Sequence, residues 1–348
     1  GCRGADCGAW RADGGICRRK LASIRRIGEV RAIEGADAIE AVQIDGWQCV
    51  AKKGEFKAGD LCCYFEIDSF LPTTNPAFEF MAVRGATKDA EGKAGYRLRT
   101  VKLRGTLSQG LALPLAALFA GPEWLNEGDD VTEHLGVTKW EPAMPACLGG
   151  EAKSTFPGWI RKTDQERIQN VPFILLLDLE YEVTIKLDGS SMTAYHRDGE
   201  FGVCSRNLDL RETEGNTFWK VARRHGLPEK LAEFGNIAIQ GELIGPGIQG
   251  NQEKLAGHAL YVFDVWMIDE QRYATQAERL DIVSHLGLNH APILHHKAIA
   301  PATVADALAL ADGPSLNAAV KREGLVFKSL CGSQSWKAIS NKWLLKHE

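Results

Sequence analysis

The chain has 348 residues, of which 45% are hydrophobic and 25% charged, and its formal net charge at pH 7 is −4. This composition excludes an intrinsically disordered protein, and the length favours two domains. The sequence has no apolar run of the roughly 18 residues that a membrane span needs, and its small negative charge argues against a surface that coats nucleic acid throughout.

The first 20 residues have the composition of a flexible lead-in, rich in Gly, Ala and Arg. They resemble neither a signal peptide nor a transit peptide, so we expect a cytoplasmic protein. The nine cysteines are an odd number, and most of those beyond the lead-in lie among apolar neighbours, which predicts reduced thiols. Cys2, Cys7 and Cys17 lack the Cys-x-x-Cys spacing of a metal clip, and the sequence assigns them no role.

From Leu21 to about Leu115, short strand-like runs alternate with turn signals. Asp45-Gly46 has the composition of a tight hairpin turn. About five such strands predict a small β-barrel, and residues 45–60 resemble the OB-folds of tRNA-binding modules. The predicted strands span residues 24–33, 41–44, 47–51, 61–67, 96–103 and 110–113.

Two segments of this barrel carry clustered cations that suit a track for nucleic-acid phosphates. The predicted contacts are Lys52, Lys53, Arg97, Arg99, Lys102 and Arg104. The two arginines before Val101 share one face of a strand and the two cations after it share the other, which predicts an interruption of the strand near Val101. A solvated edge strand is the alternative interpretation.

Pro and Gly accumulate between residues 116 and 158, which marks a domain boundary. We therefore expect a barrel domain with its linker over residues 21–140 and a second domain over residues 156–348. In the second domain, residues 163–170 read as a short capped helix, and residues 278–286 and 303–310 read as further helices.

The central stretch of the second domain is Tyr181–Met192, which alternates apolar and polar residues as far as Asp188. This period of two predicts a half-buried strand on which Lys186 and Asp188 share a face. An amine and a carboxylate placed side by side before Gly189 suit nucleophilic or metal-assisted chemistry. Such a short motif also occurs by chance on surface strands, so its significance depends on the rest of the chain.

Six collinear segments resemble motifs I, Ia, III, IIIa, IV and V of the covalent nucleotidyltransferases, the superfamily of polynucleotide ligases and capping enzymes. These segments are Lys186–Gly189, Ser205–Asn207, Gly241-Glu242, Tyr261–Asp264, Glu323–Val326 and the lysines near the end of the chain. The resemblance implies an α+β fold, in which an OB-type barrel precedes an ATP-grasp-like, antiparallel-sheet nucleotidyltransferase domain.

The barrel precedes the motifs, whereas DNA ligases and capping enzymes usually carry their OB domain after motif V. This order, with residues 102–110 and 162–170, resembles the Deinococcus-type ATP-dependent RNA ligases. The resemblance implies ATP as substrate, AMP bound covalently to Lys186, and Mg²⁺ or Mn²⁺. It also implies a nicked duplex with an RNA 3′-OH end as partner, no membrane, and a monomer.

The resemblance implies three overlapping sets of site residues. The catalytic set is Lys186, Asp188, Glu242, Glu323, Lys337 and Lys342. The metal set is Asp188, Glu242 and Glu323. The nucleotide-binding set is Lys186, Gly189, Arg206, Glu242, Phe263, Lys328, Lys337, Arg167 and Lys162, with Phe263 expected to stack on adenine. The family often has a second lysine two residues after the first in motif V, and here that position is Ile339.

Three other functions are compatible with parts of this pattern. A DNA ligase shares the chemistry, and a capping-type guanylyltransferase would use GTP instead of ATP. A non-catalytic RNA-binding protein with a degenerate ligase domain belongs to a different class, and the presence of Lys186, Glu242 and Glu323 argues against it.

Overall fold

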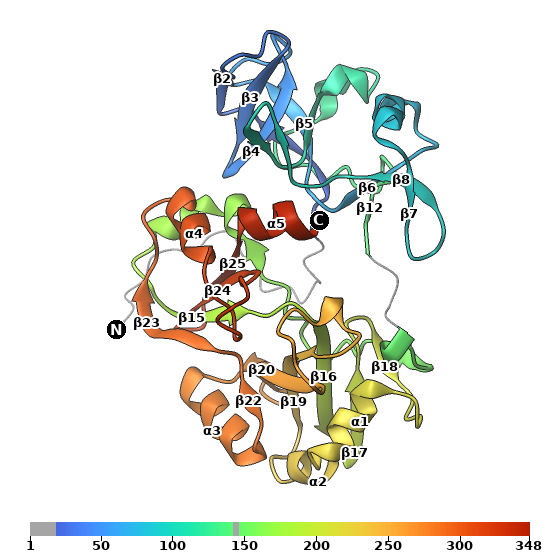
Figure 1. The fold of residues 1–348 in the computed structure, drawn as a ribbon, viewed down its shortest axis with the longest axis vertical. Coiled ribbons are helices and arrows are strands. Elements are labelled where there is room, and N and C mark those ends of the chain that lie inside the picture. Colours follow the sequence, from blue (N-terminus) through green and yellow to red (C-terminus); the bar gives the residue numbers. More distant parts are fainter. Residues whose placement is uncertain (1–18, 142–145) are drawn as a thin grey trace.

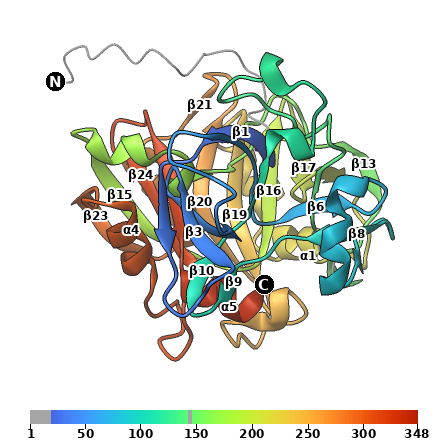
Figure 2. The same cartoon turned by 90° about the horizontal axis from the view of Figure 1, so that it is seen from above.

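The computed structural model describes residues 19–141 and 146–348. Most of the predicted lead-in, including Cys2, Cys7 and Cys17, lies outside these residues. Figure 1 shows a strand-rich first domain in blue and cyan above a second domain that contains two sheets, with α5 (Asn341–His347) lying between the domains. Figure 2, seen from above, shows the first domain lying over the strands of both sheets.

The first domain is built from short antiparallel strands. β5 is flanked by β1 and β11, while β2, β3 and β4 form a meander and β6 lies between β8 and β12. Their bounds are β1 (Ala22–Arg26), β2 (Glu29–Ala32), β3 (Ile39–Ile44), β4 (Trp47–Lys52), β5 (Leu61–Phe65), β6 (Ser69–Pro72), β7 (Thr87–Lys88), β8 (Ala94–Arg97), β9 (Val101–Leu103), β10 (Thr106–Ser108), β11 (Leu111–Pro114) and β12 (Thr138–Lys139).

Two sequence predictions about these strands are confirmed. Asp45 and Gly46 connect β3 to β4, and Asp45 adopts a φ of 51°, the left-handed conformation that such a turn requires. The predicted interruption near Val101 is also present, because β8 ends at Arg97 and β9 begins at Val101.

The second domain contains an eight-stranded and a five-stranded sheet. The first has the order β13-β18-β17-β16-β19-β20-β21, with β22 beside β20, and the second has the order β14-β25-β24-β15-β23. Their bounds are β13 (Ala152–Thr155), β14 (Glu166–Arg167), β15 (Glu180–Lys186), β16 (Ser190–Arg197), β17 (Glu200–Cys204), β18 (Leu208–Leu210), β19 (Ile237–Ile244), β20 (Ala259–Met267), β21 (Arg272–Tyr273), β22 (Asn289–His290), β23 (Ile293–Ile299), β24 (Gly324–Ser329) and β25 (Ser335–Ile339).

Helices cover each sheet, because their apolar faces need a partner layer. α1, α2 and α3 pack on the large sheet, and α4 packs against β24 and β25 of the small one (Figure 1). The α-helices are α1 (Thr217–Arg224), α2 (Leu227–Ala232), α3 (Gln276–Leu286), α4 (Val304–Ala311) and α5 (Asn341–His347). The 3₁₀ helices are η1 (Pro76–Arg84), η2 (Leu115–Ala117), η3 (Pro122–Trp124), η4 (Ala146–Leu148), η5 (Ile168–Asn170), η6 (Pro172–Leu176) and η7 (Gln249–Asn251).

The helix predicted over residues 163–170 is wrong. Glu166 and Arg167 instead form β14, which pairs in parallel with β25, and only Ile168–Asn170 forms a 3₁₀ turn. The backbone carbonyl of Gln169 accepts a hydrogen bond from Gly46 of the first domain. Contacts with other parts of the fold therefore override the local helix signals in this segment.

The two domains share a hydrophobic cluster. Ile339 at the end of β25 and Leu344 of α5 are each 2% exposed and pack among first-domain residues such as Trp47 and Tyr64. Polar contacts surround this cluster, since the Trp47 indole donates to Asn170 over 2.6 Å and the backbone N–H of Thr100 donates to Glu348 over 2.8 Å. The end of the small sheet is thus anchored in the first domain.

Gly46→Ala is expected to weaken this docking. A Cβ at position 46 would lie 2.6 Å from the Cα of Gln169 and 2.9 Å from its carbonyl oxygen, both backbone atoms that cannot swing aside. Overpacking of this kind destabilises by about 1–3 kcal/mol, so the thermal unfolding midpoint of the full chain should fall. Gly28→Ala is the matched control, because its Cβ would meet only Gln43 O at 3.5 Å. Equal midpoints for the two variants would contradict the tight contact.

The six cysteines in the described residues are free thiols, which confirms that prediction for this part of the chain. None of the helices within residues 19–141 and 146–348 combines the length and the hydropathy needed to cross a membrane.

Candidate active site

Lys186 is the last residue of β15, the strand at the centre of the predicted motif. Tyr181, Val183 and Ile185 point into the apolar core of the small sheet, so the alternate residues lie on the opposite face. The Lys186 Nζ donates to Glu323 Oε2 over 2.7 Å, and Glu323 directly precedes β24, whose Gly324 lies opposite Lys186 in the ladder. The ladder therefore brings motif I and motif IV together.

The amine of Lys186 is held as an ammonium ion in this arrangement. Burial alone would lower its pKa, but the negative charges of Glu323, Glu242 and Asp188 outweigh burial and raise the pKa above its ordinary value. Reaction of this amine as a nucleophile requires that the negative charge around it be neutralised first.

Asp188 and Glu242 approach Lys186 from a loop and from β19. Gly189 makes this approach possible, because a Cβ there would lie 2.5 Å from Leu243 O and 3.0 Å from Glu242 Cγ. Burial and repulsion from Glu323 raise the pKa of Asp188 to about 8 and that of Glu242 to about 7. Neighbouring carboxylates with raised pKa values repel one another, so a cation bound between them would be stabilised.

The carboxylates of Asp188 and Glu242 suit a divalent cation that keeps water ligands better than one held by protein ligands alone. Within residues 19–141 and 146–348, no three acidic, His or Cys side chains already stand close enough together to hold a metal ion. Mg²⁺ and Mn²⁺ accept carboxylate, phosphate and water oxygens, and Mg²⁺ usually keeps several waters. The oxygens of Asp188 and Glu242 therefore suit an ion whose remaining ligands are water and phosphate.

Lys337 and Arg167 are two neighbouring cations beside Lys186, Arg167 buried and Lys337 half-buried. They are partners in the parallel pairing of β25 with β14. Burial, followed by repulsion from Lys186 and Arg167, lowers the pKa of Lys337 to about 7. No ion pair is found for Lys337 in the described part of the chain, and Nε and Nη1 of Arg167 are buried without a hydrogen-bond partner. Two neighbouring cations with N–H groups still free to donate suit a phosphate group.

Arg206 and Lys162 lie nearer the surface. The Arg206 guanidinium donates to both oxygens of Asp164, over 3.0 and 3.1 Å, and its side chain is 47% exposed. Burial would raise the pKa of Asp164, but Arg206 and Lys337 lower it. The Lys162 Nζ donates to Asn207 over 3.0 Å, next to Arg206 in sequence. Both cations are thus held by polar partners near the surface of the second domain.

Phe263 and Lys328 link the two sheets. Phe263 is half-buried on β20, and the Lys328 Nζ of β24 lies 5.7 Å from its ring centroid. The same Nζ donates over 2.6 Å to Phe263 O and over 2.6 Å to Asp264 Oδ1. A flat aromatic ring fixed in this way suits stacking against a nucleobase.

Two of the residues predicted from the sequence, Lys342 and Arg97, form ion pairs with residues that were not predicted to belong to the site. Lys342 begins α5 beyond the end of β25, and its Nζ pairs with Asp312 over 2.8 Å while 83% of the side chain is exposed. Arg97 pairs with Asp68 over 2.9 Å and lies over the Trp140 ring at 3.8 Å. The other predicted nucleic-acid contacts are exposed: Lys52, Lys53, Arg99, Lys102 and Arg104.

Sequence reasoning missed residues at the domain junction. Asp68 of the first domain lies 3.7 Å from Arg167, and Arg19 pairs over 2.6 Å with the buried Glu66. Burial and the nearby Arg206 lower the pKa of Lys139, which pairs with Glu141. Most of these ion pairs join segments far apart in sequence, so no local pattern predicts them. The exception is the opposite charges of Lys139 and Glu141, which lie two residues apart.

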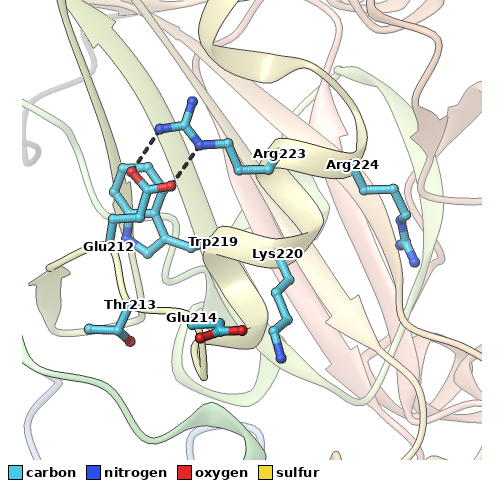
Figure 3. A pocket seen from close by; sticks show the side chains of 7 residues that line it. All are labelled: Glu212, Thr213, Glu214, Trp219, Lys220, Arg223 and Arg224. Carbon is cyan, nitrogen blue, oxygen red and sulfur yellow. Dashed lines mark hydrogen bonds and ion pairs between the residues drawn. The ribbon is translucent and has the colours of Figure 1, made fainter.

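Two surface hollows lie elsewhere. One, of about 570 Å³, lies beside α1 and is lined by Trp219, Arg223 and five other residues (Figure 3), where the Arg223 guanidinium pairs with Glu212. The other, of about 410 Å³, lies between the domains near Arg25 and Asn170. Neither is lined by a predicted site residue.

Comparisons with known proteins agree with this geometry. Residues 21–115 match a family described as an OB-fold domain, and residues 179–343 match the family described as RNA ligase. A Naegleria gruberi RNA ligase structure with PPi is 50% identical, with a TM-score of 0.90, and the match covers 94% of this chain and 99% of that one. Mutants of that ligase with ATP and Mn and with AMP and Mn match at 50% identity and the same coverage, with TM-scores of 0.89 and 0.90.

Among curated proteins, none matches this chain. The predicted fold is confirmed, with an OB-fold domain followed by a nucleotidyltransferase domain. With 50% identity over 99% of a solved relative, the chain belongs to the RNA ligase family.

Proposed function

We propose that this chain is an ATP-dependent RNA ligase that carries AMP on Lys186. One observation supports this most strongly: the Lys186 Nζ lies 2.7 Å from Glu323, in a site that also contains Lys337 and Arg167. Within the described residues Lys337 has no ion pair, and Nε and Nη1 of Arg167 are buried without a hydrogen-bond partner. The similar Naegleria gruberi ligase has structures with PPi, with ATP and Mn, and with AMP and Mn. These ligands correspond to the substrates and products of lysine adenylylation.

The reaction proceeds through three displacements at phosphorus. The neutral Nζ of Lys186 attacks the α-phosphorus of ATP, forming a P–N bond as the bond to pyrophosphate breaks. A 5′-phosphate oxygen of the RNA then attacks the AMP phosphorus, and the P–N bond breaks to return the lysine. Finally, the 3′-OH attacks the adenylated 5′-phosphate, forming the phosphodiester and releasing AMP.

The residues of the site have distinct roles in the first step. Lys337 and Arg167 bind the phosphates and stabilise the charge that develops on the α-phosphate oxygens. Phe263 stacks on adenine, while Arg206 and Glu242 orient the ribose or the strand end. A divalent cation near Asp188, Glu242 and Glu323 supplies the positive charge that lowers the pKa of the Lys186 amine.

The finer assignment is to the Deinococcus-type ligases, acting as a monomer on nicks in a duplex whose 3′-OH end is RNA. Residues 21–140 would grip the broken strand, and residues 156–348 would carry out the chemistry. The exposed Lys52, Lys53, Arg99, Lys102 and Arg104 support this division, because cations on one domain provide contacts for backbone phosphates.

The proposal is tested with the full chain, first by exposure to α-³²P-labelled ATP or GTP and then on nicks built from RNA and DNA strands. We expect label from ATP to stay on the protein through a denaturing gel, to require Mg²⁺ or Mn²⁺, and to be lost with EDTA. Nicks with an RNA 3′-OH strand should be sealed fastest. Label from GTP would support a guanylyltransferase, fastest sealing of all-DNA nicks a DNA ligase, and no label a degenerate domain.

A further inference from the structure

A series of buried or half-buried charged and polar side chains extends from Phe263 to α3. Its members in spatial order are Asp264, Lys328, Glu182, Arg279 and His290. The side chains of Lys328 and Asp264 are 15% and 7% exposed, and those of Arg279 and Glu182 are 5% and 2% exposed. Because these residues come from β20, β24, β15, α3 and β22, the series joins the two sheets.

Glu182 is fully occupied by partners from α3. One carboxylate oxygen pairs with the Arg279 guanidinium, and the other accepts a hydrogen bond from the Gln276 amide. The Arg279 Nε donates over 2.9 Å to His290 Nε2, so the His290 Nδ1, 2.6 Å from Ala291 O, carries the ring proton. Burial lowers the pKa of His290, consistent with a neutral ring that accepts from Arg279.

Two acidic residues, Asp264 and Glu182, lie near Lys328. It bonds to Asp264, but Glu182 lies directly opposite it in the β15–β24 ladder. Arg279 neutralises Glu182, which leaves the Lys328 Nζ directed toward Asp264 and the carbonyl of Phe263. A buried ion pair of this kind adds little stability compared with apolar packing, so its main effect is on the charges next to it.

We propose that Glu182 and Arg279 are positioning residues that fix the nucleobase subsite through Lys328, an inference that rests on the proposed function, in which adenine stacks on Phe263. The Lys328 Nζ lies 5.7 Å from the Phe263 ring centroid and holds the carbonyl of the same residue. Without Arg279, the uncompensated Glu182 carboxylate draws Lys328 toward β15, and the Phe263 ring loses its fixed orientation.

Arg279→Met tests this directly in the full chain. The KM for ATP in AMP transfer to the protein should rise by about 10-fold or more, the ratio expected when one charge-assisted hydrogen bond is lost. The rate at saturating ATP should change much less, because Lys186, Lys337 and the acids around them keep their contacts. An unchanged KM in a folded variant overturns the inference.

The double variant Glu182→Gln with Arg279→Met distinguishes positioning from a structural role. It removes the competing carboxylate as well as its partner, so Lys328 should return to Asp264 and the KM should fall most of the way back to the wild-type value. A purely structural role predicts that the single variant loses rate at saturating ATP as much as it loses affinity for ATP, and that result overturns the proposal, as does a KM that stays raised in the double variant. If Arg279→Met does not fold, Arg279→Gln takes its place in the comparison.

Two controls separate this inference from the proposed function. Wild-type chain should take label from ATP, and Lys186→Ala should not. If both controls behave in this way while Arg279→Met keeps its KM, only the positioning role fails. If the wild-type chain takes no label, the proposed function itself fails.

Discussion

Lys186→Ala is expected to abolish transfer of AMP from ATP to the protein, lowering its rate by about 10⁴-fold or more, because the nucleophile of a covalent mechanism has no substitute. The amine is held by Glu323 at 2.7 Å, and water is a poor replacement in a site that must form a P–N bond. The measurement is the single-turnover rate at which α-³²P label from ATP becomes attached to the full chain.

Two controls separate loss of the nucleophile from loss of the site. Lys186→Arg keeps a positive charge beside Glu323 but cannot be deprotonated near neutral pH, so it should be as inactive as the alanine variant. A nick whose 5′ end already carries AMP no longer needs the lysine nucleophile, so Lys186→Ala should still seal it. Label retained by Lys186→Arg would contradict the assigned nucleophile.

Lys337→Met is expected to lower the rate of AMP transfer by about 10²–10³-fold, the range seen when one preorganised group that stabilises transition-state charge is removed. Lys337 is half-buried without an ion pair in the described residues, and desolvation together with Lys186 and Arg167 lowers its pKa to about 7. Such a cation has no structural partner to lose, so its removal acts on the bound phosphate. The measurement is the rate of label transfer at saturating ATP.

Lys342→Met is the matched control for Lys337→Met, since both changes remove one lysine charge near the end of the chain. Lys342 is 83% exposed and pairs with Asp312, so we expect AMP transfer within about threefold of wild type, as for most exposed ion pairs. Comparable losses in both variants would show that Lys342 moves into the site when ATP binds.

The sequence predicts most reliably those features that depend on local periodicity. The alternation from Tyr181 identifies β15 and the position of Lys186 on it, because successive side chains of a strand point to opposite faces. The prediction of a half-buried strand that continues to Asp188 is wrong, because β15 ends at Lys186 and residues 181–185 are buried on both faces. The turn at Asp45-Gly46 is equally local, since its left-handed φ limits the residues that fit. The order of the motifs then identifies the partners of Lys186, including Glu323, which lies 137 residues away.

Features that depend on how the domains meet are not visible in the sequence. Arg167 belongs to a segment with helix-like signals, yet it forms a strand because β25 pairs with it, while Gly46 bonds to the nearby Gln169. Lys342 follows Lys337 closely in sequence, but β25 ends at Ile339 and α5 turns Lys342 toward Asp312. Asp68 reaches Arg167 from the other domain, through a contact that no local pattern encodes.

The anchoring of Ile339 and Leu344 among first-domain side chains restricts how this enzyme can be recombined with others. In a chimera joined at the linker, the barrel would come from another protein, and its surface would not be complementary to the side chains of Ile339 and Leu344. β25, which carries Lys337, would then lose the apolar contacts that hold its end in place, although every motif residue would still be present. Successful grafting therefore requires the barrel and the last two elements of the chain to be exchanged together.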